Sequence, residues 1–202
     1  MKTNQIKQIL EKIRRSEKRV ISKHDSEEEE DITARLLENI ERDFKELNTN
    51  ISTKIFKRKG KNSEEKRFGA DLLTVLEINN GNQSLKKYFL AQAKKLKSNE
   101  RKYYLKHDKM LISQIRKMLS ITSDSFIFVY TKNGIFVKSA MSRHNYYKCL
   151  SSFFKDFIKC FIGDIHTKSS QAPRFILNLE ENNLKELSQD INILYLRLNL
   201  DE

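Results

Sequence analysis

The 202-residue sequence predicts an α/β fold in which helices cover both faces of a sheet. Residues 70–78 alternate as a strand whose two faces are both largely apolar, which is typical of a strand covered on each side. An apolar strand at 125–131 follows a helical segment, and a crossover of that length implies parallel pairing with the strand before the helix. The predicted order is helix, three-strand antiparallel meander, helix and parallel strand.

The N-terminal third predicts two amphipathic helices and one short strand. Residues 3–20 carry an apolar stripe within a basic surface, as expected for a peripheral helix that packs on the protein or grips a polyanion. A second helix follows the acidic run at 26–31, for which Ser26 is a candidate N-cap, and has a clear apolar stripe through residue 47. The β-branched segment 49–56 is expected to form the first strand.

The middle of the chain predicts a hairpin, a helix and a second hairpin. Strands at 70–78 and 87–95 flank the residues Asn79-Asn80-Gly81-Asn82, which favour a turn. A helix is expected over 103–120, and strands at 125–131 and 135–139 flank a second turn.

The C-terminal third reads as an elaboration of this core. It predicts an apolar helix at 145–162, a strand at 175–179, a short helix at 184–187 and a final strand at 191–200 with alternating leucines. Cys149 and Cys160 fall in one helical pattern about 16 Å apart, so we expect small core residues and no disulfide between them. The expected organisation is a basic helix at 1–25, a core at 26–141 and an elaboration at 142–202.

Polar side chains interrupt the predicted central hairpin at three positions. If the connection is centred near residues 82–83, Asp71 lies opposite Lys94, with Gln92 as a diagonal neighbour. A carboxylate, an amide oxygen and an ammonium would then converge on one spot. Such a set suits a divalent cation and the negative charge of a phosphate.

The sequences Gly69-Ala70-Asp71 and Gln92-Ala93-Lys94, carried by these two strands, resemble the core of the PD-(D/E)XK restriction-endonuclease-like nucleases. The resemblance covers residues 28–140 and has Gln in the position where the family often has Glu. It implies a catalytic set of Asp71, Gln92 and Lys94. It also implies that Asp71, Gln92 and the Ala93 carbonyl bind Mg²⁺ or Mn²⁺, while Lys94 acts on the attacking water or on the charge of the transition state.

The resembled family often adds an acidic residue from the preceding helix. Glu30, seven residues before Leu37 on the core side of the first turn, is the first candidate and completes the predicted catalytic set. Glu41, in the middle of the same helix, is the second candidate. Glu77, which shares a strand face with Asp71, is the third.

The net charge of +12 is concentrated around this hairpin, because residues 54–109 contain 16 basic and 6 acidic side chains. Such a cluster attracts polyanions and favours a nucleic-acid partner. The candidate contacts lie in the loop before the hairpin and at its end: Lys57, Arg58, Lys59, Lys61, Lys95 and Lys97.

The sequence therefore predicts a Mg²⁺-dependent nuclease, with DNA expected as substrate in preference to RNA on family grounds. Restriction, phage defence and repair are all compatible settings, and a homodimer or a larger defence complex is compatible with cutting both strands. Two alternatives stay open: a catalytically degenerate module that only binds nucleic acid within a complex, and a structural protein whose basic charge is incidental. No membrane span or signal core is visible, so a cytoplasmic location is expected.

Overall fold

The computed structural model describes residues 3–45, 50–54, 68–80, 83–96, 108–142, 146–159, 162–165 and 192–199. The helices are α1 (Thr3–Ile21), the 3-10 turn η1 (His24–Ser26), α2 (Glu29–Lys45), α4 (Lys109–Leu119) and α5 (Leu150–Ile158). The strands are β1 (Asn50–Lys54), β2 (Leu72–Asn80), β3 (Gln83–Lys95), β4 (Ser125–Thr131), β5 (Gly134–Ser139), β6 (Lys148–Cys149), β7 (Asp164–Ile165) and β8 (Asn192–Asn199).

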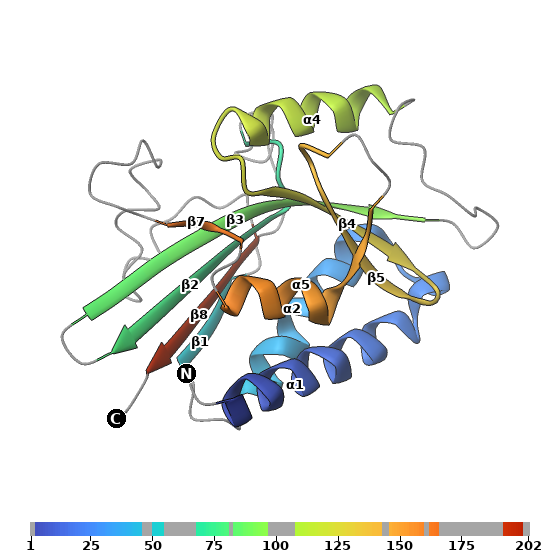
Figure 1. The fold of residues 1–202 in the computed structure, drawn as a ribbon. Coiled ribbons are helices and arrows are strands. Elements are labelled where there is room, and N and C mark those ends of the chain that lie inside the picture. The colour runs from blue at the N-terminus through green and yellow to red at the C-terminus, as the bar shows by residue number, and fades with distance from the viewer. Residues whose placement is uncertain are drawn as a thin grey trace.

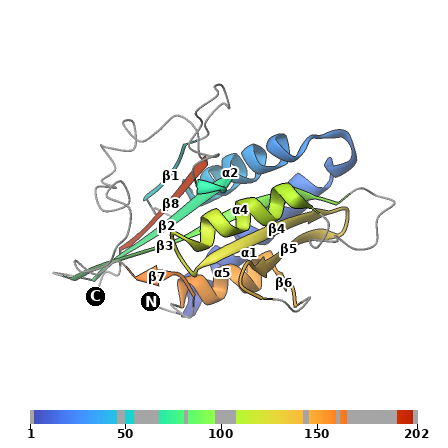
Figure 2. The ribbon, with the colours of Figure 1, turned by 90° about the horizontal axis from the view of Figure 1, so that it is seen from above.

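Helices lie on both faces of one mixed sheet, as predicted for an α/β fold (Figure 1). Helices α1, α2 and α5 cover one face. Helix α4 covers the other, where it lies across β3 and β4 (Figure 2). All residues from Ala70 to Glu77 are buried, which confirms that β2 is covered on both sides.

The apolar stripes of α1, α2 and α5 form the larger core together with one face of the sheet. Phe89 of β3 lies at its centre, with edge-on contacts at 5.0 Å to Phe153 and 4.8 Å to Phe157 between ring centroids. Helices α1 and α2 also share a buried polar contact. The carboxylate of Asp43 accepts hydrogen bonds from Ser16 at 3.0 Å and Arg19 at 2.7 Å, so this buried charge is paired.

The sheet has the strand order β1-β8-β2-β3-β4-β5-β6 among the described residues, with β7 paired to β3 beside this path. The parallel pairing of β3 with β4 and the antiparallel hairpin of β4 and β5 are confirmed. The three-strand meander is wrong, because β8 lies between β1 and β2, antiparallel to the first and parallel to the second. The last strand of the chain is thus inside the sheet and not part of an elaboration packed outside it.

Three local predictions also need correction. Helix α2 begins at Glu29, and the hydroxyl of Ser26 donates to the Lys23 carbonyl at 3.1 Å within η1 instead of capping α2. Helix α5 begins only at Leu150, because the two residues before it pair with β5 as strand β6. Cys149 is consequently exposed, not a core residue.

The other predictions for the termini and loops fall partly outside the described residues: the strand at 175–179, the helix at 184–187, Cys160, and the part of the 103–120 helix before residue 108. In the part of the chain that the structure describes, no helix is both long and apolar enough to cross a membrane.

Candidate active site

The hairpin of β2 and β3 brings Asp71 to Gln92 instead of Lys94. The register pairs Leu72 with Ala91 and Asn80 with Gln83, so the connection is centred between residues 81 and 82. This is one residue earlier than predicted, and it moves every cross-strand partner by two positions. Asp71 directly precedes β2, and its backbone N–H donates to the Ala91 carbonyl at 2.9 Å.

One carboxylate oxygen of Asp71 accepts two hydrogen bonds from β3. The donors are the side-chain amide of Gln92 and the backbone N–H of Ala93, the latter at 2.9 Å. The Gln92 amide nitrogen also lies 3.3 Å from the Ala93 carbonyl oxygen. Both side chains are buried, with Asp71 5% and Gln92 1% exposed, so these hydrogen bonds take the place of water.

Lys94 meets an acidic residue from the first turn of α2. Its Nζ lies 3.2 Å from Oε1 of Glu29, and the two side chains are 17% and 21% exposed. The second oxygen of Glu29 accepts a hydrogen bond from the backbone N–H of Lys95 at 2.8 Å. Glu29 thus attaches the start of α2 to the end of β3, at the helix end where a carboxylate is favourable.

The charges of Glu29, Lys94 and Asp71 act on one another. Burial raises the pKa of Glu29 above its ordinary value of 4.5, and the negative charge of Asp71 raises it further. The ammonium of Lys94 and the N–H of Lys95 oppose this shift. Two carboxylates and one ammonium therefore share a partly dry environment in which electrostatic interactions are strong.

A buried tyrosine supports α2 from behind this site. The Tyr130 hydroxyl lies 2.9 Å from the Thr33 hydroxyl, which donates to the backbone carbonyl of Glu29 at 3.0 Å. Because Thr33 has one hydroxyl proton, Tyr130 must be the donor to Thr33. Burial raises the pKa of the Tyr130 phenol, so it stays neutral and keeps that proton.

Close backbone packing holds α4 over the segment that leads into Asp71. Gly69 has a φ of +70°, and a Cβ at this position would lie 2.4 Å from the Gln114 carbonyl oxygen. Only glycine allows both the left-handed conformation and this approach. Oε1 of Gln114 is buried and has no hydrogen-bond partner among the described residues.

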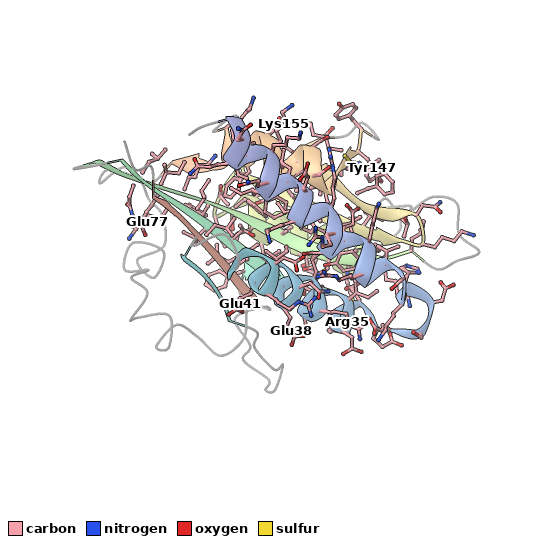
Figure 3. The ribbon with its side chains drawn as sticks, turned by 90° about the horizontal axis from the view of Figure 1, so that it is seen from below. Arg35, Glu38, Glu41, Glu77, Tyr147 and Lys155 are labelled. Atoms are coloured by element: carbon pink, nitrogen blue, oxygen red, sulfur yellow. The ribbon has the colours of Figure 1, made fainter. Side chains whose placement is uncertain are left out.

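The three acidic candidates from the sequence lie at different places in the structure. Glu30 is exposed, and its neighbour Glu29 is the glutamate that contacts Lys94. Glu77 forms an ion pair with Lys86 at 3.7 Å, six residues and about 20 Å along β2 from Asp71. Figure 3 shows Glu77 at one end of the sheet and Glu41 on α2, about three turns beyond Glu29.

Glu29 lay within the acidic run, but the sequence could not distinguish it from Glu30. Both glutamates lie seven residues before a leucine of the buried stripe, Glu29 before Leu36 and Glu30 before Leu37. Both leucines are buried, so the stripe is too wide to fix which glutamate points inward. Tyr130 was visible only as part of an apolar strand.

Most of the predicted nucleic-acid contacts lie outside the described residues: Lys57, Arg58, Lys59, Lys61 and Lys97. Lys95 is described, and its ammonium donates to the backbone carbonyl of Glu27 at 2.5 Å. This lysine therefore helps to join β3 to the start of α2, and its role as a phosphate contact stays a prediction.

One observation fits the oxygen atoms around Asp71 to Mg²⁺ or Mn²⁺. Oε1 of Gln92 is buried and has no hydrogen-bond partner in the described part of the chain. An amide oxygen, the Ala93 carbonyl and the carboxylates of Asp71 and Glu29 are hard oxygen ligands, and Mg²⁺ commonly uses only one or two carboxylates beside water and phosphate. The described residues contain no cluster of three or more His, Cys, Asp or Glu side chains that could hold a metal ion.

Comparisons with protein-family models, with curated proteins and with solved structures found no match to this chain.

Proposed function

We propose that this chain is a metal-dependent nuclease with a restriction-endonuclease-like core, in which β8 is inserted beside β2. The observation that carries the proposal is a pair of neighbouring contacts at the end of β3: Gln92 with Asp71 and Lys94 with Glu29. The charge of Asp71 also acts on Glu29, which links the two pairs electrostatically. A buried carboxylate, an amide and an ion-paired lysine at one place need a reason beyond folding, since polar groups in a core lower stability unless they are fully paired.

Asp71, Gln92, the Ala93 carbonyl and Glu29 would hold the cation, which supplies a Lewis acid and a more acidic bound water. Lys94 is the electrostatic residue of the set. Its ammonium lies at the edge of the buried cluster and stabilises negative charge that develops on a phosphate group. Glu29 fixes the position of that ammonium, and the Lys95 N–H fixes Glu29.

The substrate class follows from charge. The protein carries a net charge of +12, and its excess of basic residues surrounds the site-bearing hairpin in the sequence. A phosphodiester backbone is the polyanion that combines this attraction with a bond for a metal-activated water to cleave. DNA is the substrate that we propose first, with RNA as the alternative polymer to test.

The test is cleavage of supercoiled plasmid, single-stranded DNA and RNA in Mg²⁺ or Mn²⁺. Lys94→Ala is expected to lower the cleavage rate by about 100-fold or more while nucleic-acid binding persists. Lys86→Ala is the matched control, because it removes a lysine from the same strand at the Glu77 pair, away from the site. Equal rates for the wild type and Lys94→Ala would contradict the proposal.

A second candidate function is a binding module without catalysis. One observation favours it: the charged side chains of the site already have partners within it, with the Gln92 amide nitrogen on Asp71 and Lys94 on Glu29. Binding that weakens steeply with salt, without cleavage of any of these substrates by the wild type, would establish the module instead.

A further inference from the structure

Gln92 faces Asp71 with its nitrogen and leaves its oxygen without a partner. The amide nitrogen lies against two acceptors, the Asp71 carboxylate and the Ala93 carbonyl. On the other side of the same amide, Oε1 is buried and has no hydrogen-bond partner among the described residues, in a side chain that is 1% exposed. A buried acceptor without a donor is unfavourable, and such atoms in native proteins usually have a function or a ligand.

The chemistry of the neighbours fixes this orientation. Asp71 and the Ala93 carbonyl offer only oxygens, so the amide must turn its donor toward them. Turning the amide plane over would place Oε1 with the other two oxygens, which repel one another in the absence of a cation. A divalent cation reverses the preference, because three convergent oxygens are the ligands that it takes.

We propose that the Gln92 amide turns over when a divalent cation binds, so that Oε1 replaces the amide nitrogen beside Asp71. This inference rests on the proposed metal site and adds a property of the glutamine itself. Gln92 keeps Asp71 hydrogen-bonded in the metal-free protein, and cation binding must break that hydrogen bond. Glutamine at this position therefore lowers the affinity for the cation and stabilises the metal-free site. Glutamate would raise the affinity for the cation and destabilise the metal-free site.

The side-chain amide of Gln92 reports the turn directly in ¹H–¹⁵N NMR spectra. Its signals are assigned by their loss in Gln92→Met. In the metal-free protein we expect one amide proton shifted by its hydrogen bond to the carboxylate. On titration with Mg²⁺ that shift should disappear, whereas the side-chain amide of Gln8, exposed on α1, should not move.

Thermal unfolding of Gln92→Glu tests whether glutamine stabilises the metal-free site. In EDTA this variant places two carboxylates together and should lower Tm by roughly 4–8 °C. Mg²⁺ should return at least half of the loss, a larger rise than the wild type shows. Adding Asp71→Asn should raise the Tm of Gln92→Glu in EDTA relative to the effect of the same change in the wild type, because it removes the repulsion between the two carboxylates.

Different results would exclude the turn of the Gln92 amide and the nuclease activity. Metal-dependent cleavage with Gln92 amide signals that do not respond to Mg²⁺ would overturn this inference and leave the nuclease intact. A Gln92→Glu variant that Asp71→Asn does not relieve in EDTA would overturn it as well, because its loss of stability would then come from burial alone. Absence of any Mg²⁺ response in Tm, in NMR and in cleavage would overturn both.

Discussion

Glu29 is the residue that connects the helical layer to the end of the hairpin that carries the proposed site. One oxygen pairs with the Lys94 ammonium and the other accepts the Lys95 N–H. Its pKa is nevertheless raised, first by burial and also by Asp71, so the Lys94 charge does not fully offset the loss of solvation. The carboxylate is therefore held in place at a cost in stability.

This shift predicts how stability depends on pH. The folded protein holds the Glu29 proton better than the unfolded chain, so the related stabilisation is present below pH 4.5 and is lost as pH rises through the raised pKa. Glu29→Gln is neutral at every pH and should gain stability relative to the wild type between pH 4 and pH 7.

Urea unfolding at several pH values measures this difference. Glu30→Gln removes the same charge at the exposed neighbouring position and corrects for net charge. If the wild type instead becomes more stable relative to Glu29→Gln as pH rises, the attraction between Glu29 and Lys94 must exceed the cost of burying the Glu29 charge.

At the scale of elements, the two basic helices lie on opposite faces of the sheet (Figure 1). Helix α4 packs on β3 and β4, and Gly69 brings its backbone against the segment before Asp71. Its exposed side includes Lys109, Arg116 and Lys117, and the helix contains no acidic residue. Helix α1 exposes basic residues on the opposite layer, so α4 is the basic helix that lies against the segment leading into Asp71.

This arrangement predicts which helix contacts nucleic acid. Changing Lys109, Arg116 and Lys117 together to Gln should weaken DNA binding and reduce the slope of log K against log salt by up to about 2–3, since each phosphate that is no longer neutralised lowers the slope by about 0.9. The same charge change on α1, at the exposed Lys7, Arg15 and Lys18, is the matched control and should leave the slope nearly unchanged. If the α1 variant alone reduces the slope, nucleic acid binds the other face.

At the scale of the whole molecule, β8, the last described strand, lies inside the sheet. It separates β1 from β2 and pairs with both, and its Leu194 and Leu196 lie in the main hydrophobic core. Helix α1 packs on α2 and α5 in the layer below. The predicted N-terminal and C-terminal parts are therefore built into the same layered unit as residues 26–141.

The central place of β8 predicts a large effect from one C-terminal leucine. Leu196 is 2% exposed, so Leu196→Ala should lower the free energy of unfolding by about 2–5 kcal/mol. Leu196→Met preserves the volume and should cost less than about 1.5 kcal/mol. Urea unfolding monitored by circular dichroism measures both, and a loss below about 1 kcal/mol for Leu196→Ala, the cost of a partly exposed site, would contradict an interior β8.

Local patterns in the sequence predicted much of this fold. The apolar periods located α1, α2, β2, β3, β4 and β5, and the helix between β3 and β4 fixed their parallel pairing. Asp71, Gln92 and Lys94 could be selected because polar residues on buried strands are unusual. These signals depend on neighbours within a few residues, or on the length of a connection.

Only the tertiary structure decided the register of β2 against β3, which glutamate contacts Lys94, and the place of the last strand in the sheet. A shift of one residue in the turn exchanged Lys94 for Gln92 opposite Asp71, and composition did not distinguish the two. The choice of Glu29 over Glu30 depends on the rotation of α2 against the sheet, which its wide apolar stripe leaves open. The insertion of β8 depends on contacts between residues more than 100 positions apart. The local alternation of leucines indicates which face of this strand is buried, but it does not indicate which strands pair with it.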